Sequence, residues 1–188
     1  MKNTVKIAAF LVLAITFASF TILKTKNVNV NKSQVNWIGH KVTGQHDGTI
    51  TLKKGTLEFN GNVLTGGTFT MDMTTINATD LEGEYKTKLD NHLKSDDFFG
   101  AEKFPTATLI FTKVEGEAPN YTVTGNLTIK GKTNPVTFKM NVTEDTATTA
   151  FKIDRTKYDI KYGSASFFDD LKDKAIYDDF DLNVSLKF

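Results

Sequence analysis

Three histidines are the first candidates for chemistry, because imidazole binds metals and transfers protons near neutral pH. His40, His46 and His92 are not spaced two apart, as on a strand, or four apart, as on a helix, whereas a zinc site needs three or four converging ligands. Cysteine is absent, which removes thiolate nucleophiles and Cys-based metal ligands. We therefore expect no metal site and interpret the histidines as polar or turn residues near strand ends.

Carboxylates are the second candidates, since glycoside hydrolysis and general acid–base catalysis use pairs of them. The acidic residues in question are Asp96-Asp97, Asp169-Asp170, Asp173, Asp178-Asp179 and Asp181. Lysines are interleaved with the later ones, so solvated loops and a solvent-facing strand explain them better. The chain also lacks nucleophile-elbow, dinucleotide-binding and P-loop motifs. The sequence therefore predicts no catalytic residue, no cofactor and no enzymatic activity.

Charge and composition limit the partners. Lys and Arg number 23 and Asp and Glu 22, so no net field attracts nucleic acid. Hydrophobic residues make up 39% of the 188 residues, with fifteen Phe among them, which is enough to bury a core in one domain. We expect any partner to be recognised by shape and burial. A homodimer is left open.

The N-terminus is typical of an export signal. Lys2 and Lys6 precede a long apolar run that ends in small residues, which predicts a signal peptide over residues 1–23, cleaved between about Ala18 and Thr25. The alternative is an uncleaved membrane anchor, because the apolar stretch approaches the roughly 17 residues that a spanning helix needs. Export to the periplasm is the expectation.

Alternating apolar and polar residues predict strands through most of the remaining chain. The last strand is the clearest, with Phe180, Leu182, Val184, Leu186 and Phe188 on one face and polar residues on the other. We expect a polar lead-in over residues 24–31 and one β-domain over 32–188. About eight antiparallel strands favour a closed barrel over an open sheet, because closure removes exposed edges.

Three features interrupt this pattern. Lys53-Lys54-Gly55 separates the apolar segments Thr49–Leu52 and Thr56–Phe59, and Gly66-Gly67 predicts a bend before Thr68. A second short helical or irregular segment is expected over residues 164–173, where Phe167-Phe168 and Leu171 would supply apolar contacts.

One helix is expected between Thr79 and Phe99. Leu81, Tyr85, Leu89 and His92 or Leu93 recur there at helical spacing among charged residues. Thr79 or Asp80 is the expected N-cap.

The large apolar side chains must either fill the barrel or line a cavity, and both occur in barrels of eight strands. A filled core is the alternative that ordinary protein packing favours. Strand alternation predicts that the following residues point into the lumen: Trp37, Phe111, Phe138, Met140, Leu182, Val184 and Leu186. By charge complementarity, a ligand's polar head would sit near His40, Lys41 or Arg155, although we expect Arg155 to be structural and paired with a carboxylate.

Two motifs resemble the YceI-like family. The segment His92–Phe99 reads His-Leu-Lys-Ser-Asp-Asp-Phe-Phe and is followed by Phe104-Pro105-Thr106-Ala107. The segment Gly125–Val136 reads Gly-Asn-Leu-Thr-Ile-Lys-Gly-Lys-Thr-Asn-Pro-Val. Shorter matches bring the resemblance to nearly all of residues 35–188.

The resemblance implies an extended, lipocalin-like antiparallel barrel, exported to the bacterial periplasm, whose apolar interior holds a polyisoprenoid such as a polyprenyl phosphate or a quinone tail. It offers no ligand motif that can be placed residue by residue, so the lumen residues rest on periodicity. We therefore expect an isoprenoid carrier or store. The main alternative is a stress-response or interaction barrel with a filled core and no ligand, and a weaker one is a carboxylate enzyme acting on lipid or sugar.

Overall fold

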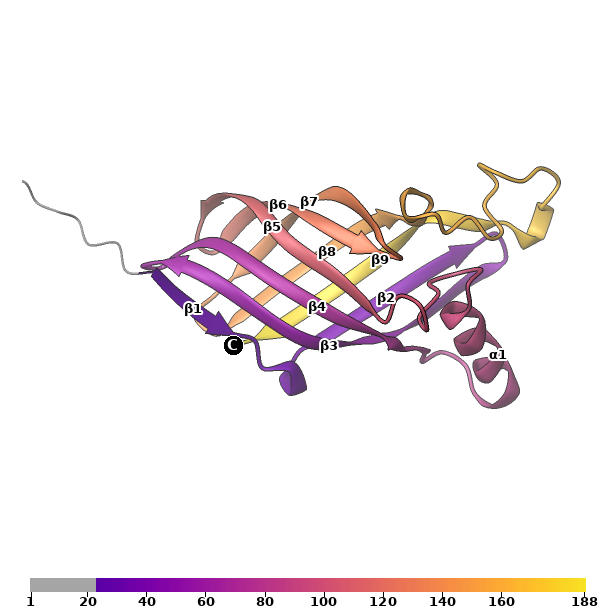
Figure 1. Cartoon of the computed structure of the whole chain (residues 1–188), viewed down its shortest axis with the longest axis horizontal. Helices are drawn as coiled ribbons and strands as arrows, with labels where there is room; N and C mark the ends of the chain where they lie inside the picture. The colour runs from indigo at the N-terminus through magenta and orange to yellow at the C-terminus, as the bar shows by residue number, and fades with distance from the viewer. Residues whose placement is uncertain (1–22) are drawn as a thin grey trace, which may run out of the picture.

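The computed structural model describes residues 23–188, so the predicted signal peptide lies outside the described residues except for Leu23. Strands β2 to β9 pair in the order β3-β2-β9-β8-β7-β6-β5-β4, and β4 pairs again with β3 (Figure 1). Every strand pairing in this ring is antiparallel. The predicted closed antiparallel barrel of about eight strands, with one helical excursion, is confirmed.

The strands are β1 (Leu23–Asn27), β2 (Gln34–Lys41), β3 (Gly44–Asn60), β4 (Val63–Ala78), β5 (Thr106–Glu117), β6 (Asn120–Ile129), β7 (Lys132–Val142), β8 (Thr146–Asp154) and β9 (Ile176–Lys187). The helix α1 (Gly83–Lys94) follows β4. Short 3-10 helices are η1 (Val30–Lys32), η2 (Arg155–Tyr158) and η3 (Lys172–Lys174).

The two apolar segments on either side of Lys53-Lys54-Gly55 form one long strand, β3. The register with β4 shifts between Leu52 and Lys54, so an irregularity replaces the interruption that the sequence suggested. This length lets β3 pair with β2 at its start and with β1 at its end. The polar lead-in therefore contains a strand, because its backbone completes the part of the β3 edge that β2 does not reach.

Gly66-Gly67 lies inside β4, so the strand continues through the predicted bend, although the β3–β4 register shifts next to Gly66, between Glu58 and Phe59. A Cβ atom on Gly67 would lie 2.9 Å from the ring of Phe111. The glycine is needed because an aromatic ring packs directly against the strand, which sequence alone does not distinguish from a bend.

One end of the barrel is filled with side chains. Leu57, Leu64 and Val123 are almost completely buried there, and the Leu64 amide donates to the Tyr121 hydroxyl at 3.3 Å. Phe188 lies beside Phe59, with ring centroids 6.2 Å apart. We call this the closed end.

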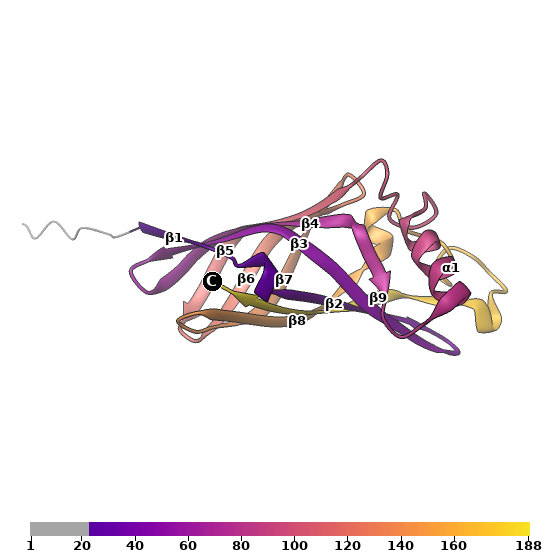
Figure 2. The same ribbon diagram turned by 90° about the horizontal axis from the view of Figure 1, so that it is seen from below.

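The helix lies at the opposite end, together with the β2–β3 turn and the segment between β8 and β9 (Figure 2). It begins at Gly83, with Glu82 as an N-cap that makes no side-chain bond. The predicted caps are wrong: Thr79 donates to the Asp47 carboxylate at 2.9 Å and Asp80 pairs with His46 at 2.7 Å. These side chains join the β4–α1 link to β3 instead of capping the helix.

The irregular segment expected over 164–173 is present, with η3 at its end. The apolar contacts expected there are not made as predicted, because Phe167 and Phe168 remain 50% and 51% exposed. In residues 23–188 no helix has the length and apolar character needed to cross a bilayer.

Strands β7 and β8 meet over a short ladder only. Their register is limited to Met140–Val142 opposite Ala147–Thr149. Beyond it, side chains make the contacts: the rings of Phe138 and Phe151 stack with centroids 4.5 Å apart, and Asn134 of β7 donates to the carbonyl of Lys157 in η2 at 2.9 Å. Pro135 has no amide hydrogen and lies in the part of β7 that pairs with β6 but not with β8. Such an edge position tolerates proline.

Candidate functional site

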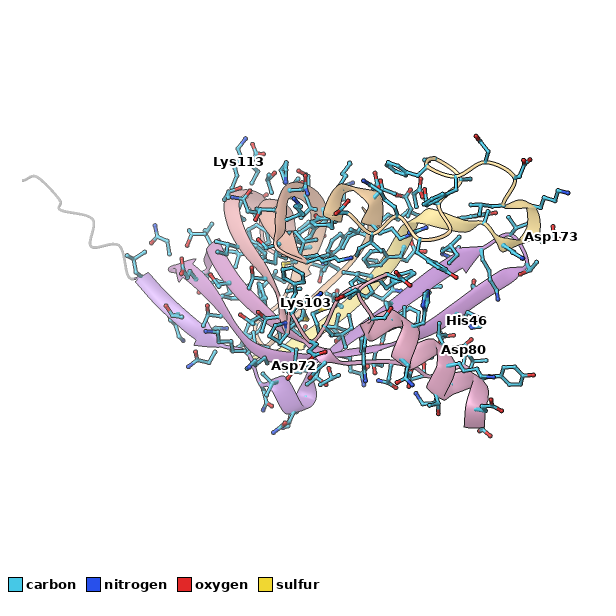
Figure 3. All side chains as sticks on the ribbon, turned by 45° about the vertical axis from the view of Figure 1, so that its right-hand side comes forward. His46, Asp72, Asp80, Lys103, Lys113 and Asp173 are labelled. Atoms are coloured by element: carbon cyan, nitrogen blue, oxygen red, sulfur yellow. The ribbon has the colours of Figure 1, made fainter. Side chains whose placement is uncertain are left out.

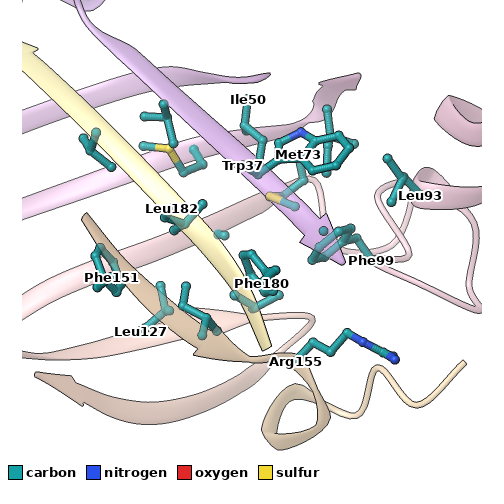
Figure 4. A pocket seen from close by; sticks show the side chains of 18 of the residues that line it. Trp37, Ile50, Met73, Leu93, Phe99, Leu127, Phe151, Arg155, Phe180 and Leu182 are labelled. Carbon is teal, nitrogen blue, oxygen red and sulfur yellow. The ribbon is translucent and has the colours of Figure 1, made fainter. Parts of the chain in front are cut away.

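An apolar cavity of about 200 Å³ lies inside the barrel, between the filled closed end and α1. Its wall is almost entirely carbon and includes side chains from β2, β3, β4, β5, β6, β7, β8, β9 and α1. Figure 4 shows Trp37, Ile50 and Met73 close together on one side and Phe151, Phe180 and Leu182 on the other. The cavity reaches the α1 end, which we call the mouth, where Lys41 and Tyr177 belong to its wall.

Partial exposure of inward-facing residues shows that the middle of the barrel is hollow. Phe180, Leu182 and Val184 line the cavity but are only partly buried, whereas Leu186, nearer the closed end, is 3% exposed. Since these side chains point away from the outer face of β9, their exposed surface faces the cavity. The barrel thus has a filled core at one end only.

Most of the residues predicted for the lumen lie on this wall. They are Trp37, Phe138, Met140, Leu182, Val184 and Leu186. Phe111 is the exception: it points inward but packs against Phe69 and Phe138, with ring centroids 5.4 and 6.0 Å apart, outside the cavity. Alternation gives the direction of a side chain but not its depth along the barrel.

The sequence reasoning missed the part of the wall that the helix and the following turn provide. Leu89, Leu93, Phe98 and Phe99 all line the cavity, and the last three are largely buried. Helical spacing indicated that Leu89 faces the core, but only the packing of α1 across the barrel brings it to the mouth.

His40 lies at the rim but is engaged with the outer face. Its Nε2 atom lies 2.6 Å from the Asp181 carboxylate, beside the shift in β2–β9 register between Gly39 and Lys41. The hydrogen bond from His40 keeps the pKa of Asp181 below its usual value, against the opposing effect of burial and with help from the charge of Lys152. His40, Lys41 and Arg155 were predicted to lie near a head group; His40 is engaged by Asp181, whereas Lys41 forms no ion pair within residues 23–188.

Arg155 is 2% exposed and binds the backbone. It donates to the carbonyl oxygens of Ile160 at 2.8 Å, Tyr177 at 3.0 Å and Ile176 at 3.1 Å. The carboxylate of Asp178 is farther, at 3.8 Å. Burial lowers the pKa of Arg155, and the nearby carboxylates oppose this. In Figure 4 its guanidinium points away from Phe180 and Leu182, so the side chain connects η2 to the start of β9.

Two buried nitrogen atoms in the cavity wall have no hydrogen-bond partner within the described chain: Trp37 Nε1 and His92 Nε2. The His92 ring packs edge-on against Tyr162, with centroids 4.4 Å apart. An unpaired buried polar group is unfavourable, so a ligand atom that accepts from Trp37 Nε1, or that donates to or accepts from His92 Nε2 according to its tautomer, would relieve that cost.

Two other titratable pairs are separate from each other, and one of their members, His46, belongs to the cavity wall. His46 pairs with Asp80 at 2.7 Å and Lys103 with Asp96 at 2.5 Å, and Figure 3 shows the His46–Asp80 pair beside α1. Among residues 23–188, no three His or carboxylate side chains gather as metal ligands would. The site is therefore characterised by its apolar wall.

Comparison with known proteins adds the following. The family model of the YceI-like domain matches residues 27–188. Protein YceI of Escherichia coli O6:H1 (strain CFT073) is 38% identical over 82 residues, which cover 39% of this chain and 42% of that protein. The match thus spans less than half the length of that curated relative.

Two solved structures share the fold. Burkholderia cenocepacia BcnA superimposes with a TM-score of 0.70 at 20% identity, covering 86% of this chain and 99% of that chain. A polyisoprenoid-binding domain from Saccharophagus degradans, implicated in plant cell wall breakdown, gives a TM-score of 0.61 at 11% identity, covering 88% of this chain and 98% of that chain.

Proposed function

Because this chain belongs to the YceI-like domain family, we propose that it binds a long isoprenoid lipid inside its barrel and acts as a carrier or store. The observation that carries the proposal is the apolar cavity inside the barrel. Packed side chains close the barrel at one end, and the cavity opens toward the mouth at the other. The polyisoprenoid-binding domain from S. degradans has the same fold. A ligand of the polyprenyl phosphate or quinone type would suit such a cavity.

The apolar tail would supply most of the binding energy. An isoprene unit has five carbons, and at about 0.8 kcal/mol per buried CH₂ each unit contributes about 4 kcal/mol of gross transfer free energy. Ordering the chain and losing its translational freedom opposes binding by roughly 4–15 kcal/mol. A few units therefore suffice, and affinity would depend more on tail length than on the head group.

Because the closed end is filled with side chains, a ligand could enter the cavity only from the mouth and in one orientation. The tail would extend toward Phe138 and Leu186, and the polar head would stay at the mouth near Lys41. Lys41 lies on the cavity wall, and its ammonium group would suit a phosphate. Residues 1–23 would act as a signal peptide for export to the periplasm, where such a carrier could meet membrane lipids.

The test is organic extraction and mass spectrometry of the purified protein, combined with Val184→Trp. Val184 points into the cavity, so a larger side chain would occupy the space of the lipid. We expect the wild-type protein to yield a long-chain isoprenoid. Val184→Trp should lose it while melting at the temperature of wild-type protein stripped of lipid, because the indole fills empty space.

Asn183→Trp is the matched control, since Asn183 is the exposed neighbour on the outer face of the same strand. It should keep both the lipid and the wild-type melting temperature. If no lipid is ever extracted from the wild type and Val184→Trp melts below the stripped protein, the change is overpacking of a filled core, and the carrier proposal fails.

A further inference from the structure

Exposed apolar side chains gather around the mouth. Six of the nine large apolar residues that are most exposed in residues 23–188 lie at this end: Val42, Tyr85, Tyr162, Phe167, Phe168 and Tyr177. They come from the β2–β3 turn, from α1, from the segment between β8 and β9 and, for Tyr177, from the start of β9, and Figure 1 shows these parts at the same end of the barrel. We call these six residues the apolar rim. Exposed aromatic groups collected at one place mark an interaction surface.

The rim is continuous with the cavity. Tyr177 is 54% exposed and also forms part of the cavity wall, and Val42 directly follows Lys41, which lines the cavity as well. A molecule that covers the rim would therefore cover the opening through which a ligand enters.

The segment that carries Phe167 and Phe168 is held firmly at its base. Ser164 is completely buried, and its carbonyl accepts hydrogen bonds from the amides of both phenylalanines, at 3.1 and 3.0 Å. The amide of Ile176 donates to Gly163 at 2.8 Å, which closes the base on β9. The fold thus holds the turn while leaving both rings half exposed.

We propose that the apolar rim docks on the surface of a lipid bilayer and places the mouth against it. This inference rests on the proposed function, because an isoprenoid chain is drawn from a bilayer and returned to one. Passage between bilayer and cavity without crossing water avoids exposing the apolar chain. Tyrosine suits the interfacial region and phenylalanine the depth below it.

The arrangement of the rim favours a bilayer over a protein partner. Its side chains stand on four separate parts of the chain around an opening, so they form no continuous flat patch. A protein interface needs a closely packed, complementary core, whereas a fluid bilayer adapts to separate anchors.

Charge predicts which bilayer is bound. Between residues 161 and 174, Lys161, Lys172 and Lys174 balance Asp169, Asp170 and Asp173, so this part of the rim has no net charge. Docking should therefore depend on apolar insertion and be almost independent of anionic lipid and of salt.

The experiment measures cosedimentation of the protein with vesicles of phosphatidylcholine alone and of phosphatidylcholine with phosphatidylglycerol. The wild type should bind both, with less than about a twofold change on adding anionic lipid or salt. The double variant Phe167→Ser/Phe168→Ser should bind about tenfold more weakly or worse, since two large apolar groups are lost. Stripped and refilled with isoprenoid in detergent solution, it should hold as much lipid as the refilled wild type, because neither ring lines the cavity.

Ile110→Ser is the matched control. Ile110 is 50% exposed, like the two phenylalanines, but lies on β5 outside the rim, and its replacement should leave vesicle binding unchanged. The vesicles carry no isoprenoid, so docking is measured independently of whether the purified protein holds a lipid.

Three outcomes would overturn the proposal. The first is vesicle binding that the double variant retains, and the second is binding that requires phosphatidylglycerol and disappears with salt. The third is a wild-type dimer that ignores vesicles and dissociates in the double variant, which would show that a second copy covers the rim.

Discussion

At the scale of single residues, Arg155 belongs to the cavity wall, but its guanidinium is predicted to hold a loop and not to bind the ligand. Arg155→Met keeps the apolar stem but removes the donors to three backbone carbonyls. Since a buried group without its partner costs about 1–3 kcal/mol, we expect the free energy of unfolding to fall by about 3 kcal/mol or more. Urea denaturation would measure it, and the lipid carried per folded molecule should not change.

Lys157→Met provides the comparison. Lys157 is largely exposed and lies 4.0 Å from the Asp154 carboxylate, so its loss should change stability by less than about 0.5 kcal/mol. An Arg155 variant of normal stability that no longer retains lipid would contradict the structural role.

Asp181 should contribute to the loss of stability in acid. The hydrogen bond from His40 holds the pKa of Asp181 below its usual value, although burial opposes it and Lys152 adds to it. A carboxylate with a lowered folded-state pKa stabilises the fold above the ordinary aspartate pKa of about 3.9, and this contribution disappears as the pH falls through the folded pKa.

In Asp181→Asn the fold should therefore lose stability near neutral pH and show a flatter decline below about pH 4. Thermal melts across this pH range would measure the decline. Asp179→Asn, an exposed change on the same outer face, should follow the wild-type curve. If the melting temperatures of wild type and Asp181→Asn fell equally steeply below about pH 4, the prediction would be contradicted.

Residue periodicity predicted the direction of side chains well and their surroundings poorly. It placed Leu182 and Val184 on the inner face, where they line the cavity. It could not show that Phe111 lies in the filled part or that His40 binds Asp181. The position of Phe111 and the His40–Asp181 contact both depend on strand register, which cannot be predicted from residue alternation.

At the scale of elements, Gly48 allows β3 to close against β4 under Trp37. A Cβ atom there would lie 1.9 Å from the Asn77 carbonyl oxygen and 2.5 Å from the indole ring. Because a backbone atom can yield only if the strands separate, Gly48→Ala should cost at least about 2 kcal/mol of unfolding free energy. Calorimetry would detect this as a lower melting temperature.

Gly39→Ala is the control on the neighbouring strand. Its Cβ atom would meet only the Trp37 ring, at an ordinary 3.8 Å, so stability should stay within about 0.5 kcal/mol of wild type. Equal effects of the two substitutions would show that strand closure is not limited by space at Gly48.

The sequence predicted whether a segment forms a helix or a strand more reliably than where that helix or strand begins, ends and pairs. The helix and the last strand follow from the spacing of their apolar residues, whereas β1 was read as a polar lead-in because its residues do not alternate toward a core. Its place is set by the unpaired edge of β3. The short β7–β8 ladder could not be predicted either, because alternation does not indicate over how many residues two adjacent strands pair.

At the scale of the whole molecule, stability should increase with the length of the isoprenoid tail. Stripped protein refilled with isoprenoid alcohols of increasing length should melt at progressively higher temperature until the cavity is full, because ligand that binds only the folded state stabilises it by mass action. Differential scanning fluorimetry would follow the series. A melting temperature that depends on the head group but not on tail length would contradict tail-driven binding.

The first and last residues that the structure describes, Leu23 and Phe188, both lie at the closed end. Leu23 pairs with Asn60 there, and Phe188 packs beside Phe59, while the mouth lies at the far end (Figure 1). A tether on either terminus would therefore hold the molecule with its opening facing outward. Such a barrel could be fixed to one surface while it exchanges cargo with a second, so the geometry suits a bridge across a gap between two surfaces.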